Sequence, residues 1–247
     1  MGKLMKYEFR KTMFSKIILL VITAVLEILL LAGIFLNWEN GLGWGIIGLT
    51  LCVVIGIFYI GLESLMVFHR DLNTKQSYML FLTPYDSYQI LGAKVLENGI
   101  SLLMAGCFFA ALVAIDFSVA VAYLGGFKEL INVVTHILKQ ISVEIQFTTA
   151  ESLMVVFAVL SGWLMTIVTG FLAIVLCATV LAGRRFSGFV SFLIFLLLSW
   201  GCSVLTNRIP ESLETAVYYT LYILAALVLT VVMYLISGWI MERKLSV

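Results

Sequence analysis

Four acidic side chains lie inside stretches of the sequence that are otherwise strongly apolar. They are Glu27, Glu63, Glu97 and Asp116. An ionised carboxylate in a lipid environment is costly, so such a residue usually faces a protein interior, a water-filled cavity or a partner. One interpretation places these carboxylates along a translocation path that favours cationic or amphipathic cargo. The other is a protonated carboxyl group hydrogen-bonded to a neighbouring helix, and both stay open for Glu27 and Asp116.

Among these carboxylates, Glu97 has a lysine within one helical turn. Lys94 lies three residues before Glu97, which is one turn of a helix, so the two side chains could pair. No cation lies at a comparable depth for Glu27 or Asp116. We therefore expect those two side chains to face the interior of a helix bundle, a cavity or a partner subunit.

The motifs of several enzyme classes are missing from the sequence. It contains neither a G-x-x-x-x-G-K-[ST] phosphate-binding loop nor an H-E-x-x-H zinc motif. Its two histidines, His69 and His136, are predicted on opposite sides of a membrane, so neither can act as base to a serine such as Ser101. The four cysteines form no C-x-x-C pair. We expect no enzyme activity and no metal site in this chain.

Composition places these residues in a membrane protein. Of the 247 residues, 62% are hydrophobic and 12% are charged, whereas soluble domains carry about 25% charged residues. Apolar runs long enough to cross a bilayer recur along the chain. The sequence predicts an all-α polytopic membrane protein with one transmembrane domain over residues 1–247. Its six spans are predicted at 17–35, 44–68, 90–124, 152–181, 188–205 and 216–241.

The distribution of positive charge predicts the orientation of these spans. With the N-terminus in the cytoplasm, twelve of the fifteen Lys and Arg residues fall in cytoplasmic segments. Such a bias is typical of the cytoplasmic side of membrane proteins. Trp38, Trp44 and Trp200 then lie near the outer boundary and Trp239 near the inner one, as interfacial anchors do. Both termini are predicted in the cytoplasm.

Two amphipathic segments are predicted to lie along the membrane rather than across it. Residues 2–16 mix five cations with apolar side chains, which favours a short helix in the cytoplasmic headgroups. The alternative is a basic flank that only sets the topology. Residues 126–145 repeat apolar side chains at spacings of three and four, which predicts an external amphipathic helix between the third and fourth spans.

Two apolar segments have simpler interpretations. Gly41 and Gly45 form a G-x-x-x-G pattern, which permits close helix contact but also fits a flexible external turn, the reading we favour from sequence. The span at 188–205 reads as apolar all round. It is expected to face lipid or a second copy of the chain.

The polar stretch between the second and third spans is long for a passive loop. Thr83 is a favoured N-cap residue and Pro84 suits the first position of a helix, so a helix is predicted to start there with Asp86 at its third position. Just before it, residues 78–82 read Tyr-Met-Leu-Phe-Leu. An exposed apolar cluster of this kind marks an interaction surface.

This stretch resembles the permease subunits of ABC-2 type exporters. The resemblance lies in the order of the features along the chain. A basic cytoplasmic start is followed by two spans, an acidic residue, a Leu-Thr-Pro step and an Ile-Leu-Gly-Ala-Lys run. The matching positions are Asp71, Thr74, Leu82, Thr83, Pro84, Ile90, Leu91, Gly92 and Lys94. The resemblance implies a cytoplasmic coupling helix between the second and third spans.

The resemblance also implies partners and a function. The coupling helix would dock on a separate ATP-binding subunit, which would hold ATP and Mg. The implied docking residues are Arg70, Asp71, Tyr78, Phe81, Leu82, Thr83 and Pro84. A second permease subunit, identical or homologous, would complete the exporter. The expected location is the bacterial plasma membrane, and the expected cargo is a peptide, an antibiotic or other drug, or a lipid.

Other functions are compatible with the same residues. The cluster at residues 78–82 could rest on the bilayer surface, and the 69–90 loop could serve a non-transport scaffold or a sensor subunit. A channel is less favoured, because no span shows a continuous polar stripe. The net charge of +1 gives no reason to expect nucleic-acid binding.

Overall fold

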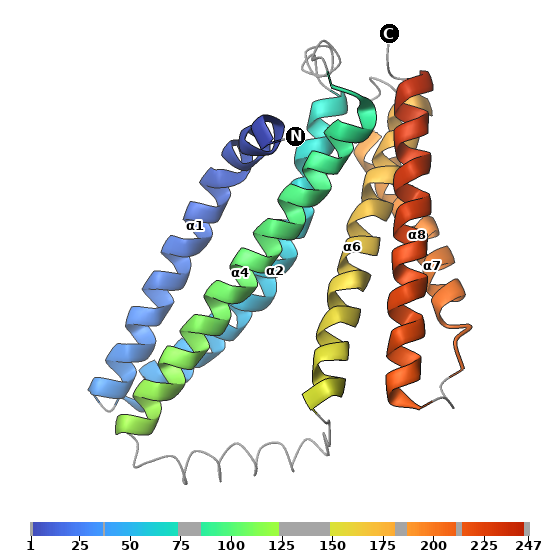
Figure 1. Ribbon diagram of the computed structural model, residues 1–247. Helices are drawn as coiled ribbons and strands as arrows, with labels where there is room; N and C mark the ends of the chain where they lie inside the picture. The colour runs from blue at the N-terminus through green and yellow to red at the C-terminus, as the bar shows by residue number, and fades with distance from the viewer. Residues whose placement is uncertain are drawn as a thin grey trace. The chain divides into compact units, whose positions relative to one another are not determined.

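The computed structural model describes residues 2–36, 38–73, 85–123, 149–180, 187–210 and 214–244. Nearly all of these residues are in six α-helices, each with a stretch long and apolar enough to cross a membrane (Figure 1). The helices are α1 (Gly2–Phe35), α2 (Glu39–Asn73), α4 (Ser87–Tyr123), α6 (Thr149–Val180), α7 (Ser187–Thr206) and α8 (Thr215–Lys244). The prediction of an all-α fold with six candidate spans is confirmed for the described residues, and the six apolar helices are compatible with a multi-pass membrane protein.

The helix boundaries differ from the predicted ones in two places. Residues 2–16 and the first span form one continuous helix, α1. The third span begins at Ser87 rather than at Thr83-Pro84, because Tyr85 and Asp86 are not helical. The carbonyl oxygen of Asp86 accepts hydrogen bonds from the N–H groups of Gln89 and Ile90, at 2.9 and 3.1 Å. Asp86 therefore occupies the N-cap position, where aspartate is favoured.

Several predicted features lie outside the described residues. They include Tyr78, Phe81, Leu82, Thr83 and Pro84 of the coupling segment and the external helix at residues 126–145. These features stay predictions.

The chain divides into two compact units, and each is described by itself. The first unit contains Met1–Phe9, Gly61–Gly99 and Phe147–Val247. It holds the end of α2, the start of α4 and all of α6, α7 and α8. The second unit contains Arg10–Ile60 and Ile100–Gln146, and so holds most of α1, the first part of α2 and the later part of α4.

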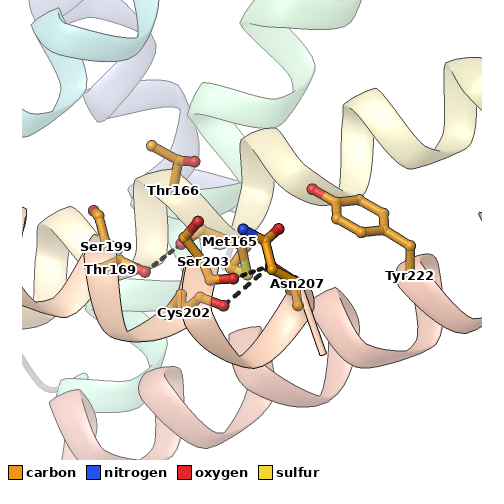
Figure 2. Close-up of a pocket in the computed structure, with 9 residues that line it drawn as sticks. Met165, Thr166, Thr169, Ser199, Cys202, Ser203, Asn207 and Tyr222 are labelled. Carbon is orange, nitrogen blue, oxygen red and sulfur yellow. Dashed lines mark hydrogen bonds between the residues drawn. The ribbon is translucent and has the colours of Figure 1, made fainter. Parts of the chain in front are cut away.

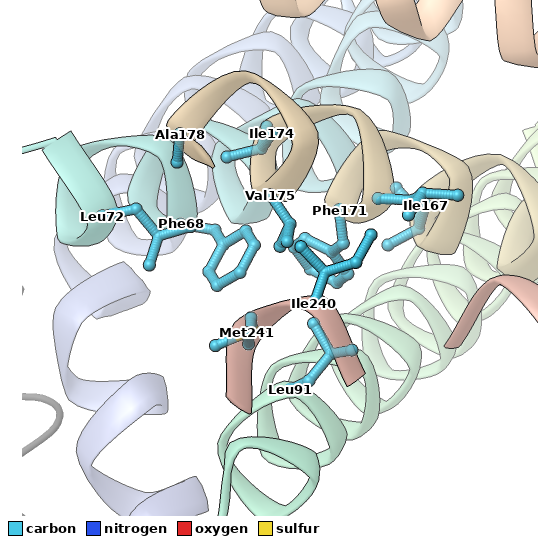
Figure 3. Packing of buried hydrophobic residues seen from close by; sticks show 11 residues of the cluster. Phe68, Leu72, Leu91, Ile167, Phe171, Ile174, Val175, Ala178, Ile240 and Met241 are labelled. Carbon is cyan, nitrogen blue, oxygen red and sulfur yellow. The ribbon is translucent and has the colours of Figure 1, made fainter. Parts of the chain in front are cut away.

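Helix α6 is the centre of the first unit. It packs against α8 and α7, and 56% of its most apolar window is buried, a larger share than in any other candidate span. Its side chains form the core with the end of α2, the start of α4 and the end of α8 (Figure 3). Phe68 of α2 meets Phe171 of α6 edge to face, with ring centroids 5.0 Å apart.

The sequence predicted that the span at 188–205 is apolar all round. Helix α7 instead buries several polar side chains. Its buried side chains are Ser187, Ser191, Cys202 and Thr206. Exposed phenylalanine and leucine side chains cover other positions of the same helix. These four side chains of α7 therefore turn toward the protein rather than toward lipid.

In the second unit, glycines bring α1 and α2 into close contact. A Cβ atom added to Gly45 would lie 2.8 Å from the Cα atom of Leu30, and one added to Gly33 would lie 2.5 Å from the backbone nitrogen of Leu42. Gly41 and Gly45 lie within α2, so the favoured interpretation of a flexible turn was wrong. At Gly45 the absence of a side chain allows the backbones to approach.

Candidate functional site

Lys94 forms the centre of a buried ionic cluster in the first unit. Its Nζ atom donates to Oε2 of Glu8 at 2.8 Å and to Oδ2 of Asp71 at 2.7 Å. All three residues are buried, with exposed fractions of 2% for Lys94, 4% for Glu8 and 2% for Asp71. The Nζ atom also lies 5.6 Å from the ring centroid of Phe68. We refer to Glu8, Asp71 and Lys94 as the ionic cluster.

The ionic cluster joins three segments that are distant in the sequence. Glu8 lies in the second turn of α1, Asp71 in the last turn of α2 and Lys94 in the second turn of α4. The chain between α2 and α4 is the connection at residues 74–86. The Asp71–Lys94 pair therefore fastens the two helix ends that flank this connection, and Glu8 adds the N-terminal segment to them.

Burial makes this arrangement sensitive to the loss of its cation. Removing one partner of a buried ion pair typically costs about 3–5 kcal/mol, because the other charge is left without compensation. Here loss of Lys94 would leave two buried carboxylates, Glu8 and Asp71. The three side chains are therefore expected to hold their geometry as one unit.

Other contacts fix the start of α4 in place. Leu4 of α1 packs with Ile90 and Ala93 of α4, and Tyr85 packs against them. On α8, the hydroxyl of Tyr234 donates to the carbonyl oxygen of Tyr88 at 2.6 Å. A Cβ atom at Gly238 would lie 2.2 Å from the Tyr88 ring, so only glycine leaves room for this ring as it lies. The start of α4 is thus held by α1, α2 and α8.

The structure separates the roles of two neighbouring residues that the sequence grouped together. Arg70 is exposed, whereas Asp71 is buried against Lys94. A carboxylate in this position could contact a partner only after leaving its lysine. We therefore regard Asp71 as a positioning residue for the connection, and Arg70 as the one of the pair that a partner could reach.

Lys94 pairs with carboxylates on other helices. Helical spacing offered Glu97 as a possible partner, and the ammonium group donates hydrogen bonds to Glu8 of α1 and Asp71 of α2. Packing decides this, because α1 and α2 bring Glu8 and Asp71 to the Lys94 side chain. Glu63 and Glu97 are buried in the same unit, with exposed fractions of 6% and 3%.

Glu27 and Asp116 come together in the second unit, on α1 and α4. Their side chains lie close enough to interact. Oε2 of Glu27 and Oδ1 of Asp116 are buried and have no hydrogen-bond partner in the described part of the chain. The two carboxyl groups that the sequence left without a cation are therefore neighbours. Of the four predicted acidic residues, Glu63 and Glu97 lie in the first unit, and Glu27 and Asp116 lie in the second.

Sequence reasoning missed Glu8 and the polar face of α7. Glu8 is the one acidic residue in a strongly basic N-terminal segment, and that exception was the available signal. On α7, Ser199, Ser203 and Thr206 follow one another at spacings of four and three. This spacing places them on one face of the helix.

Within the described residues, no group of three or more His, Cys, Asp or Glu side chains could hold a metal ion. The ionic cluster links α1, α2 and α4 through two buried hydrogen bonds, so it is suited to holding these helices together. Comparison with protein-family models, with curated proteins and with solved structures finds no match to this chain.

Proposed function

We propose that this chain is the permease subunit of an ATP-driven exporter, of the ABC-2 type that its loop sequence resembles. It would form the translocation path and couple to a separate ATP-binding subunit through the connection at residues 74–86. The observation that carries the proposal is the ionic cluster, which fastens α2 and α4 on either side of that connection. Six helices able to span a membrane are the other support.

The physical argument concerns the transmission of force. A docking segment can move membrane helices only if it is attached to them rigidly. Asp71 and Lys94 lie two residues before the end of α2 and seven residues after the start of α4, respectively. A displacement of the connection would therefore reach both helices together, and through Glu8 it would reach the N-terminal segment.

The sequence contains no phosphate-binding loop, so in this proposal the partner would hold ATP and Mg. Tyr78, Phe81 and Leu82 would supply the apolar docking surface, with Thr83 and Pro84 shaping it and Arg70 at its edge. A second permease subunit would complete the path in the bacterial plasma membrane. The cargo would be a peptide, an antibiotic or a lipid, and Glu27 and Asp116 would face its path.

Co-purification tests the proposal. The tagged chain would be purified from its native membranes in mild detergent, and the captured proteins would be searched for a subunit with a phosphate-binding loop. Phe81→Asp should remove that subunit, because a charge in an apolar contact is left unpaired. Phe81→Leu is the matched control and should retain it.

Two results would contradict the proposal. One is the capture of no ATP-binding subunit by the unmodified chain. The other is retention of that subunit by Phe81→Asp at the level of Phe81→Leu. Capture of a different protein, lost in Phe81→Asp, would instead favour a scaffold or sensor subunit that uses the same loop.

A further inference from the structure

A polar groove lies between α6, α7 and α8 in the first unit, and none of the predicted site residues line it. Its volume is about 300 Å³, at the lower end of small-molecule sites. Six of its lining residues carry hydroxyl groups: Thr166, Thr169, Ser199, Ser203, Thr206 and Tyr222 (Figure 2). Among the described residues that line it, none is Lys, Arg, His, Asp or Glu.

The threonines of the groove present acceptors. The hydroxyl of Thr166 donates to the carbonyl oxygen of Gly162 at 2.9 Å, and that of Thr169 donates to the carbonyl oxygen of Met165 at 2.6 Å. Thr206 donates in the same way to the carbonyl oxygen of Cys202 at 3.1 Å. A hydroxyl whose proton is used in this way keeps lone pairs to accept hydrogen bonds. A ligand here must therefore supply donors.

Ser199 adds a hydroxyl group without a hydrogen-bond partner among the described residues. Its Oγ atom is buried. A buried polar atom without a partner is costly, and a ligand or water that hydrogen-bonds it removes that cost. Because a serine hydroxyl both donates and accepts, the ligand group beside it can do either.

Tyr222 and Asn207 form the other end of the groove, away from Ser199 and Thr169 (Figure 2). A Cβ atom at Gly162 would lie 2.9 Å from the hydroxyl oxygen of Tyr222, so the glycine leaves room for the tip of this side chain beside α6. The ring offers a flat apolar face with a polar tip. Asn207 contributes an amide that donates and accepts.

These features select a class of ligand. An anion would find no cation in the groove, and a cation would find no carboxylate, so either would be desolvated without compensation. A ligand that only accepts hydrogen bonds would leave the threonine oxygens unmatched. A hydroxyl group donates and accepts at one atom, and several on a small ring match the row of side-chain hydroxyls.

We propose that this groove binds a neutral polyhydroxyl group, such as a sugar. The groove lies on helices able to span a membrane, so the sugar could be the headgroup of a neutral glycolipid or a free sugar from the aqueous phase. The inference rests on the groove alone, and the binding test needs no ATP-binding subunit. Its outcome is therefore independent of the proposed function.

Native mass spectrometry of the full chain in an octaethylene glycol detergent, which carries no sugar, tests the inference. The probes are a monoglucosyl diacylglycerol, the same diacylglycerol without the sugar, phosphatidic acid, maltose and a blocked trialanine. Stoichiometric binding of the glucosyl lipid, with none of diacylglycerol, supports a lipid headgroup as the source. Binding of maltose with the same variant pattern supports a free sugar.

Matched variants locate the binding. Thr166→Val and Ser199→Ala should each weaken it about three- to tenfold, because each removes one hydrogen-bonding group. Thr220→Val is the control, since Thr220 is also exposed and donates to its own helix, at the carbonyl oxygen of Ala216, but does not line the groove. It should bind as the unmodified chain does.

Four results would overturn the inference. The first is that neither sugar probe binds, and the second is that Thr220→Val weakens sugar binding as much as the groove variants do. The third is that both groove variants bind as the unmodified chain does. The fourth is that phosphatidic acid or blocked trialanine competes as strongly as the glucosyl lipid. Ser203→Ala provides a second groove variant if Ser199→Ala does not fold. An unchanged melting temperature in the same detergent separates a loss of binding from a loss of structure.

Discussion

Two places in this molecule each bring two carboxyl groups together, and they differ in a single cation. In the ionic cluster, the ammonium group of Lys94 is bound to Glu8 and Asp71 at 2.8 and 2.7 Å. Glu27 and Asp116 instead lie beside each other, and no ion pair is found for either one in the described part of the chain.

This difference predicts different responses to substitution at the two places. In the ionic cluster the cation belongs to Lys94, so its removal leaves Glu8 and Asp71 buried without a positive charge. One carboxyl oxygen atom of Glu27 and one of Asp116 are buried without a hydrogen-bond partner in the described part of the chain.

The largest effect should come from removing the cation of the ionic cluster. Lys94→Met leaves Glu8 and Asp71 buried without compensation, so we expect the free energy of unfolding to fall by about 3–5 kcal/mol. Equilibrium unfolding in detergent by sodium dodecyl sulfate measures this change.

A triple variant serves as the control for this prediction. It combines Glu8→Gln, Asp71→Asn and Lys94→Met, which removes all three charges. Stability should recover substantially, since replacing a whole buried ion cluster by uncharged groups often changes stability little. Equal loss in the single and triple variants would show that packing of the lysine stem, not charge, holds these helices.

A smaller effect is expected at the carboxyl pair. Glu27→Gln keeps a polar group that can hydrogen-bond Asp116, because an amide donates to a carboxylate, so stability should change by less than about 1 kcal/mol. Glu27→Leu leaves Asp116 without this partner and should cost about 1–3 kcal/mol. If transport and stability both survive Glu27→Gln unchanged, the pair has only a structural role. A loss as large as that of Lys94→Met would remove the contrast between the two places.

The smallest effect on stability is expected beside the ionic cluster. Arg70 is exposed next to buried Asp71, and exposed substitutions usually change stability by no more than about 0.5 kcal/mol. Arg70→Ala should therefore unfold like the unmodified chain while it captures less of the proposed ATP-binding partner. Asp71→Asn should lower stability, since it weakens a buried ion pair. Similar unfolding in both variants would contradict the different burial of these neighbours.

Much of the fold could be predicted because membrane spans are encoded locally. A bilayer requires long apolar helices, and their length and composition are visible in the sequence. Boundaries were less predictable, as the start of α4 at Ser87 shows, because Thr83-Pro84 and Asp86 both offer favoured start signals. The glycines of α2 were misinterpreted because a G-x-x-x-G pattern fits either a turn or a helix contact until the opposing helix is known.

The candidate site was predictable only in part. The sequence picked out Lys94, Asp71, Glu27 and Asp116 as polar residues that need partners. It could not supply Glu8 as the partner of Lys94, since 86 positions separate them. It also described α7 as apolar all round, because the serines and threonines of that helix are few and their common face becomes meaningful only beside α6 and α8.

The sequence by itself determined that this chain forms six apolar helices able to cross a membrane, because hydrophobicity and helix length act residue by residue along the chain. Only the tertiary structure decided which buried charges neutralise each other, which glycines bring backbones together and which hydroxyl groups line a common groove. These properties depend on distances between side chains from separate helices, and such distances exist only once the helices have packed.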